Sequence, residues 1–187
     1  MTITFRTLTI SDQSYFPAGL ELLNRTQGRD LFGPLYLEES VNDPQSLVVA
    51  AFDDEEIVAV GVAKLIELLE FYEAFEPGIS QELSRKKVGS FSTLCVKENL
   101  QGKGIGQKIS FIRLEWLKSH KCQVILGCSW VSGKSHTSDR VFTKLGFKQT
   151  AFLENAFLES SLKNPFICPG CEVQPCKCSA ILFRLTL

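Results

Sequence analysis

A glycine-rich run at residues 101–106, Gln-Gly-Lys-Gly-Ile-Gly, constrains the fold more than any other feature. The apolar residues 88–96 before it predict a buried strand, and after it Ile105, Ile109 and similar residues recur at near-helical spacing. A helix N-terminus attracts anions through its unpaired N–H groups and its dipole, and glycine lets a phosphate approach the backbone. We therefore predict that this run, here called the glycine loop, binds a pyrophosphate, with Lys103 as a nearby cation.

The spacing of the glycines excludes two other phosphate loops. A Walker loop needs Gly-Lys-Ser/Thr after a longer gap, and a dinucleotide loop needs Gly-x-Gly-x-x-Gly with an acidic residue about twenty positions later. The spacing Gly102-x-Gly104-x-Gly106 matches neither of them. A glycine-rich turn without a ligand stays open as the alternative.

The remaining pattern predicts an α/β fold with strands and helices along one domain, residues 1–187. Apolar and alternating runs predict strands at residues 3–8, 47–52, 57–66, 88–96, 122–130, 147–153 and 181–187. Helices are expected at about residues 12–25, 36–41 and 137–145 and directly after the glycine loop, with Ser11 or Asp12 as the first cap. Residues 67–87 predict a helical excursion that Pro77 and Gly78 interrupt.

Composition limits the class of protein. The 187 residues suffice for one compact core, and the apolar content of 44% is ordinary for a globular chain. A formal net charge of -1 offers no basic excess for nucleic acid, and no apolar run is long enough to span a bilayer. No secretory signal is visible at the N-terminus. We expect a cytoplasmic protein that binds neither nucleic acid nor membrane.

Two motifs together resemble those of the GNAT N-acetyltransferases. Residues 94–109 are similar to that family's acetyl-CoA motif, Gln/Arg-x-x-Gly-x-Gly/Ala after a strand, and Gln101, Gly104 and Gly106 stand at its defining positions. Residues 138–147 resemble the second signature, in which a helix ends at Lys-x-Gly-Phe. The order and separation of the motifs agree with the family, and the resemblance covers most of the chain.

The resemblance implies a fold and a mode of cofactor binding. The fold would be a mixed, mostly antiparallel sheet of about seven strands, flanked by helices and splayed between strands 88–96 and 122–130. Acetyl-CoA would lie in that splay, with its pantetheine paired to a strand edge and its pyrophosphate on the glycine loop. The residues so implied in cofactor binding are Leu94, Cys95, Val96, Gln101, Gly102, Lys103, Gly104, Ile105, Gly106, Ser135 and Phe142.

The implied reaction is acetyl transfer from acetyl-CoA to a primary amine, by direct attack in a ternary complex. A backbone N–H near Leu94 or Cys95 would serve as the oxyanion donor. The acceptor stays unidentified: a small metabolite, an antibiotic, or a protein N-terminus or lysine. A homodimer is possible, because many members of the family dimerise.

The chain departs from the family where proton transfer is concerned. Phe142 stands where many members have a tyrosine that acts as general acid, and Ser135 replaces a frequent asparagine that contacts CoA. Residues 89–93 carry no carboxylate base. The candidates for a base are Glu67, Glu70 and Glu73, for which a solvated charged face is the alternative. These departures keep a second hypothesis open, a non-catalytic CoA-binding or regulatory module.

Four cysteines crowd into a loop at residues 164–179, between the last two expected strands. Their spacing is Cys-x2-Cys-x4-Cys-x-Cys, and Pro169, Gly170 and Pro175 supply tight turns between them. Four thiolates suit one tetrahedral zinc ion, which would fold a loop too small for its own core. The alternative is four thiols without a metal. The predicted ligands are Cys168, Cys171, Cys176 and Cys178, and a stiffened loop here would help to select the acceptor.

Overall fold

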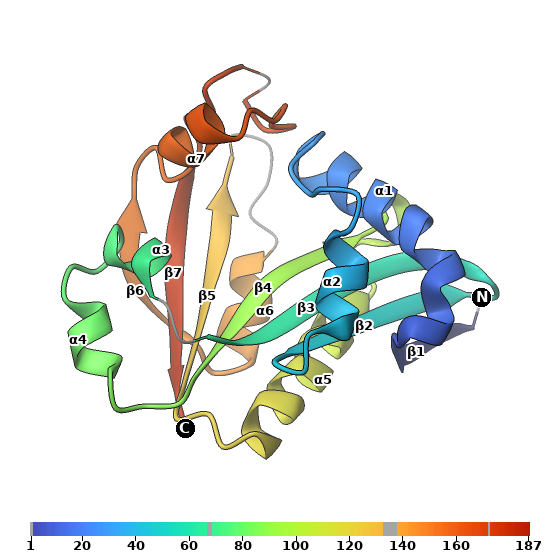
Figure 1. Cartoon of the computed structure of the whole chain (residues 1–187), viewed down its shortest axis with the longest axis horizontal. Helices are drawn as coiled ribbons and strands as arrows, with labels where there is room; N and C mark the ends of the chain where they lie inside the picture. The colour runs from blue at the N-terminus through green and yellow to red at the C-terminus, as the bar shows by residue number, and fades with distance from the viewer. Residues whose placement is uncertain (1, 67–68, 133–137, 172) are drawn as a thin grey trace.

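In the computed structural model, which describes residues 2–66, 69–132, 138–171 and 173–187, one mixed sheet organises the chain (Figure 1). Its seven strands lie in the order β1-β2-β3-β4-β5-β7-β6, and every neighbouring pair except β4 and β5 is antiparallel. This confirms the predicted fold class. The strands are β1 Ile3–Thr7, β2 Ser46–Asp53, β3 Glu56–Ile66, β4 Val88–Val96, β5 Val124–Val131, β6 Lys148–Leu153 and β7 Ser179–Thr186.

Helices cover both faces of this sheet (Figure 1). One face carries a first apolar cluster under α1 and α2 and a second one under α3 and α4, while α5 and α6 pack on the opposite face. Among the described residues, no helix has the length and apolar character that crossing a membrane requires. The helices are η1 Ile10–Tyr15, α1 Phe16–Gln27, α2 Tyr36–Asn42, α3 Glu70–Glu73, α4 Ile79–Leu83, η2 Glu98–Leu100, α5 Ile105–Ser119, α6 Ser138–Lys144 and α7 Leu158–Lys163.

The sheet divides between its two parallel strands. β4 and β5 pair only from Val88 opposite Val124 to Phe91 opposite Gly127. Beyond these pairs β4 stays with β3 and β5 stays with β7, so the two strands diverge, as Figure 1 shows. A register break in β4, where Ser92 has no partner on β3, bends the strand at this point. We call the gap between residues 92–96 of β4 and residues 128–131 of β5 the split.

The first helix differs from its expected form. Residues 12–25 were expected to form one helix capped by Ser11 or Asp12, but a 3-10 helix, η1, comes before α1. Pro17 explains the boundary, because a residue without an N–H fits the first turn of a helix and not its interior. The cap of η1 is Thr9, whose backbone N–H donates to the Asp12 carboxylate at 2.9 Å.

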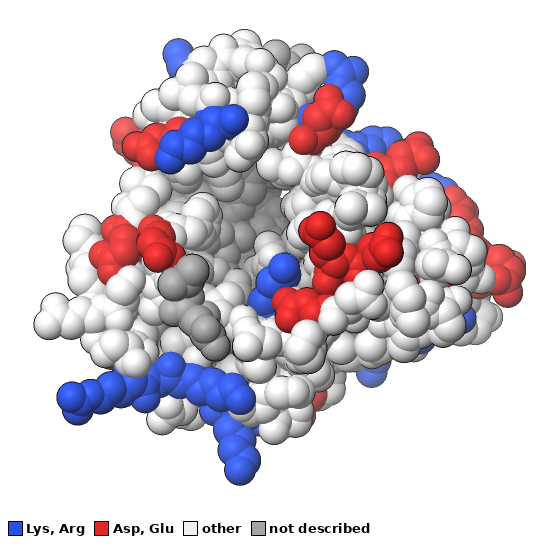
Figure 2. Space-filling view, viewed as in Figure 1, with Lys and Arg blue, Asp and Glu red and all other residues white. Residues whose placement is uncertain are grey.

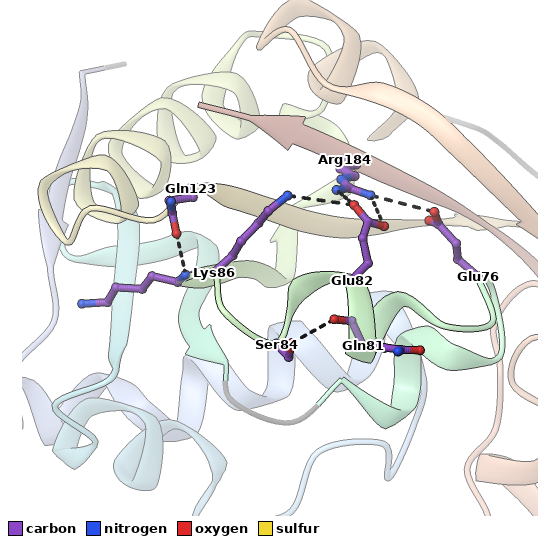
Figure 3. Close-up of polar contacts among 8 residues, drawn as sticks. Glu76, Gln81, Glu82, Ser84, Lys86, Gln123 and Arg184 are labelled. Carbon is purple, nitrogen blue, oxygen red and sulfur yellow. Dashed lines mark hydrogen bonds and ion pairs between the residues drawn. The ribbon is translucent and has the colours of Figure 1, made fainter.

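The excursion between β3 and β4 is attached to β7, in the other half of the sheet, by charged contacts (Figure 3). Arg184 on β7 forms two hydrogen bonds with the carboxylate of Glu82 on α4, and its Nη1 lies 3.9 Å from Oε1 of Glu76. Pro77 and Gly78 separate α3 from α4, as the sequence predicted. The excursion therefore covers the β5–β7 side of the split, while α1 and α2 cover the β4 side.

Candidate functional site

The glycine loop joins β4 to α5 through two residues in the left-handed region. Gly104 is the N-cap of α5 with φ of 83°, and Gly102 has φ of 76°. Residues other than glycine rarely adopt this backbone conformation. The sharp turn therefore accounts for the glycines at positions 102 and 104. Gln101 holds the loop to the strand, since its amide Nε2 donates to the Val96 carbonyl at 3.1 Å. The N–H groups of the first turn of α5 have no intrahelical acceptor and are available to a ligand.

Positive charge gathers beside this turn. A surface hollow of about 300 Å³ is lined by Lys103, Gly104 and Lys108, and its other lining residues are Ile3, Phe5 and Ile105. Two ammonium groups next to a helix N-terminus suit a ligand with several negative charges. The glycine loop therefore has the chemistry that a pyrophosphate needs.

The backbone of β4 presents to the split an edge with which no other described strand pairs. The N–H and C=O of one strand residue point to the same side, and the side alternates along the strand. Lys97 N–H donates to Val58 on β3, so Cys95 also faces β3, while Leu94 and Val96 face the split. The register thus favours the N–H of Leu94, one of the two predicted oxyanion donors, over that of Cys95.

Gln27, at the end of α1, contacts this edge in a way that the sequence analysis missed. Its Nε2 donates to the Leu94 carbonyl at 2.8 Å, and its Oε1 accepts from the Thr93 hydroxyl at 2.7 Å. In the sequence, Gln27 lies 67 positions before Leu94 and 66 positions before Thr93. No local motif could reveal them, because only the packing of α1 on the sheet brings the groups together.

Arg113 on α5 supports the bend in β4 from beneath. The residue is 2% exposed, and its guanidinium donates to the carbonyls of Thr93 at 2.8 Å and Val62 at 3.1 Å, which face each other on β4 and β3 next to the register break. Burial lowers its pKa to about 9, so the group keeps its charge at neutral pH. One signal was present in the sequence: Arg113 continues the apolar stripe of Ile105 and Ile109, where a charge requires a buried partner.

Two tyrosines stand on opposite sides of the split, on the face that α1 to α4 cover. The hydroxyl of Tyr72 on α3 lies 2.7 Å from that of Ser90 on β4, and both residues are buried. Burial raises the pKa of Tyr36 on α2, an effect that the nearby hydroxyl of Ser92 opposes. Figure 2 shows a hollow in the face of the molecule turned toward the viewer, with acidic side chains on both sides of it. The sequence offered no motif for either tyrosine.

The three glutamates that the sequence suggests as candidate bases are Glu67, Glu70 and Glu73. Glu73 accepts hydrogen bonds from the backbone N–H groups of Gly78 and Ser80 at 2.8 Å each, at the start of α4. The bonds from Ser80 and Gly78 lower the pKa of Glu73, which weakens it as a base. Glu70 is exposed on α3. Glu67 lies outside the described residues.

Phe142, implied in cofactor binding, belongs to the core beneath the point where β4 and β5 diverge. Its ring stacks on Phe183 at 4.7 Å and lies against Gly127, the last residue of β5 that pairs with β4. The ring is 6% exposed and carries no proton donor. Ser135, the other residue implied by the second signature, lies outside the described residues.

The four clustered cysteines come together near the end of β5. Their sulfur atoms all lie within 4.8 Å of one another, and all four are free thiols in the structure. Tetrahedral metals such as zinc take ligand sets of this kind. The predicted metal ligands are therefore neighbours in space as well as in sequence.

Several solved structures share this architecture over nearly their full length. The NatC complex bound to Gag peptide and CoA includes a chain with 14% identity and a TM-score of 0.71, covering 100% of this chain and 99% of that one. NAA60 of Arabidopsis thaliana in complex with acetyl-CoA has 18% identity and a TM-score of 0.67, with coverage of 100% and 99%. The ribosomal-protein-S18-alanine N-acetyltransferase from Escherichia coli has 11% identity and a TM-score of 0.64, with coverage of 99% and 94%.

Comparison at the level of sequence identifies the family. No curated protein sequence matches the chain. The profile of the acetyltransferase (GNAT) family matches residues 12–147, which is more than half of the 187 residues. This match contains both the glycine loop and the second signature. The chain therefore belongs to the GNAT family of acetyltransferases.

Proposed function

We propose that this protein transfers an acetyl group from acetyl-CoA to a primary amine, by direct attack within a ternary complex. The observation that carries the proposal is the edge of β4 that faces the split and leads into the glycine loop. A pantetheine arm can add to such an edge as an extra strand while the pyrophosphate lies on the N–H groups of α5. Donor thioester and acceptor amine then meet in the split.

The reaction needs little covalent chemistry from the protein. The amine nitrogen attacks the thioester carbonyl, a C–N bond forms, the C–S bond breaks, and the CoA thiolate leaves and takes up a proton. The N–H of Leu94 faces the split and is suited to stabilise the negative charge that develops on the carbonyl oxygen. Most of the catalytic effect would come from positioning the two substrates. Since Phe142 has no proton to give, the hydroxyls of Tyr36 and Tyr72, which lie near Ser92 and Ser90 of β4, and water are candidates for carrying protons among the described groups.

The hollow that Figure 2 shows is the proposed entrance for the amine. Glu38 and Glu39 on α2 and Glu70 on α3 are exposed, and Figure 2 shows acidic side chains on both sides of the hollow. Such charges favour a cationic acceptor over an anionic one. One of the similar structures is a complex bound to a Gag peptide and CoA, and another is a ribosomal-protein-S18-alanine N-acetyltransferase. Peptides with a free amino terminus therefore belong in the first set of acceptors to be tried.

The test is an acceptor panel with product identification. The purified protein is incubated with acetyl-CoA and peptides that begin with Met or Ala, the same peptides blocked at the N-terminus, a lysine-containing blocked peptide, and a small polyamine. Thiol release follows turnover, and mass spectrometry locates the acetyl group. We expect at least one primary amine to raise thiol release above the acceptor-free rate and to gain one acetyl group on its nitrogen.

The blocked peptide without lysine is the matched control, because it keeps the sequence and lacks the amine. It should release no more thiol than buffer alone. Binding of acetyl-CoA without acetylation of any amine would contradict the proposed transfer and would favour the alternative, a CoA-binding or regulatory module.

A further inference from the structure

We propose that Cys168, Cys171, Cys176 and Cys178 bind one zinc ion, and that this ion holds a strap across the end of the split. The strap consists of residues 164–171 and 173–178, which lie between α7 and β7. In Figure 1 it stands at the top of the molecule, beside the connection that follows α1. Neither the shared fold nor the transfer reaction requires this site.

The distances between the sulfurs fit a tetrahedral metal. Zn–S bonds of about 2.3 Å place the sulfurs of a tetrahedral site about 3.8 Å apart. The sulfurs of Cys168 and Cys178 are 3.6 Å apart, and those of Cys171 and Cys176 are 3.8 Å apart. A disulfide requires about 2.05 Å, so neither pair is bonded. The four thiols thus converge on one point. Cysteines that were buried only as small apolar residues would not need to converge in this way.

The protein around the cysteines shapes this arrangement. Cys168, Cys176 and Cys178 are buried, and the N–H of Cys176 donates to the hydroxyl of Ser161 on α7 at 2.9 Å. Gly170, between the first two ligands, lies so close to β5 that a Cβ there would come within 2.3 Å of the Trp130 ring. The turn between the ligands is therefore seated on the end of β5.

The strap reaches from this seat to the other side of the split. Ile167, one residue before the first ligand, pairs with Arg29 through two backbone hydrogen bonds of 3.0 Å each. The ring of Phe166 packs against Gly28. Arg29 follows α1, which packs on β3 and β4, whereas Cys178 directly precedes β7, the partner of β5. The strap is thus a direct link between the two halves of the divided sheet.

The link ends close to the edge of β4 that faces the split. Gln27, whose amide contacts Leu94 and Thr93, is separated from the paired Arg29 by a single residue. A metal that fixes the strap therefore also fixes the end of α1 against β4. Without the metal, this short segment keeps only a small apolar cluster and a few hydrogen bonds to order it, and metal binding is what folds many loops of this size.

Metal content and ligand identity test the first half of the proposal. We expect elemental analysis of the purified full chain to give about one zinc ion and no iron per chain. Reconstitution with Co²⁺ should give the visible bands of a tetrahedral ion and thiolate charge-transfer bands in the near ultraviolet. Cys176→Ser should lose the metal, whereas Cys122→Ser, which changes a buried cysteine outside the cluster, should keep it. A wild-type protein without zinc and without thiolate–cobalt bands would overturn the site.

Amide hydrogen exchange tests the strap, and the experiment uses only the wild-type protein. Wild-type protein is compared before and after zinc is removed with a chelator. We expect the exchange rates of the Arg29 and Ile167 amides to rise by about tenfold or more, while those of the central β2–β3 pair stay unchanged. Unchanged protection at Arg29 and Ile167 after removal of the metal would refute the strap. None of these readouts uses acetyl transfer, so their failure and that of the proposed function can be told apart.

Discussion

Arg113 shows how a single side chain can set the shape of the split. Its guanidinium contacts two carbonyls at the register break of β4 and the hydroxyl of Ser110 at 2.9 Å, and it lies 4.2 Å from the centre of the Phe91 ring. Burial of a cation is costly unless hydrogen bonds compensate for the lost water. We infer that this cost is tolerated because the carbonyls at the bend would otherwise lack donors.

Arg113→Met should therefore weaken the fold. The methionine fills similar space and leaves the carbonyls of Val62 and Thr93 without the guanidinium, so we expect the free energy of unfolding to fall by about 1–3 kcal/mol. Urea denaturation measures this change. The control is Arg140→Met at an exposed position of α6, where the change should stay within about 0.5 kcal/mol. Equal stability of the two variants would show that the guanidinium does not support the bend.

At the residue scale, local spacing in the sequence singled out residues that the structure places in one turn. Gly104 and Gln101 stand in a motif whose spacing follows from one turn, and the structure gives Gly104 the expected positive φ. Gln27 and Tyr72 belong to the site only because distant elements pack together. Pairings of this kind depend on tertiary structure and leave no trace in local spacing.

At the scale of elements, alternation and apolar runs located all seven strands within about two residues, because burial on a sheet imposes period two. The split was expected only through the family resemblance, since it depends on the register break at Ser92. Helix α7 was missed because its six residues are too few to show a period.

The excursion between β3 and β4 gives a prediction at this scale. Arg184 lowers the pKa of Glu82 from its ordinary value of 4.5, mainly through their hydrogen bonds. A lowered carboxyl pKa stabilises the fold above that ordinary value, and the stabilisation is lost as the pH falls through the folded pKa. Because the pair is partly exposed, Arg184→Gln should cost at most about 1 kcal/mol at pH 7, and less at high salt.

Urea denaturation of wild type and Arg184→Gln at about pH 7 and about pH 3.5 measures this effect. The difference in stability should shrink at the lower pH, which lies below the ordinary carboxyl pKa of 4.5, so that Glu82 of the unfolded chain binds a proton. Arg85→Gln, an exposed change in the same excursion, serves as the control. A difference that is as large at acidic as at neutral pH would contradict the ion pair as its cause.

At the scale of the whole molecule, one sheet divides into two halves that different parts of the chain connect. Paired residues of β4 and β5 join the halves at one end, and the strap joins them at the other through Arg29 and Ile167. The edge of β4 that faces the split lies between these two connections. This arrangement leaves the sheet open at its centre, where we propose that acetyl-CoA binds, and links the two halves at both ends.

The central claim is that acetyl-CoA lies along the split with its pyrophosphate on the glycine loop. Titration calorimetry with acetyl-CoA tests it, with Gly104→Glu and Gly78→Glu compared with the wild type. Both glycines are helix N-caps with positive φ, at 83° and 91°, and each has open space around it, so the two changes impose similar strain. Only Gly104 belongs to the glycine loop. We expect Gly78→Glu to bind like the wild type and Gly104→Glu, still folded, to lose about tenfold or more in affinity; equal affinity of the two variants would contradict the account.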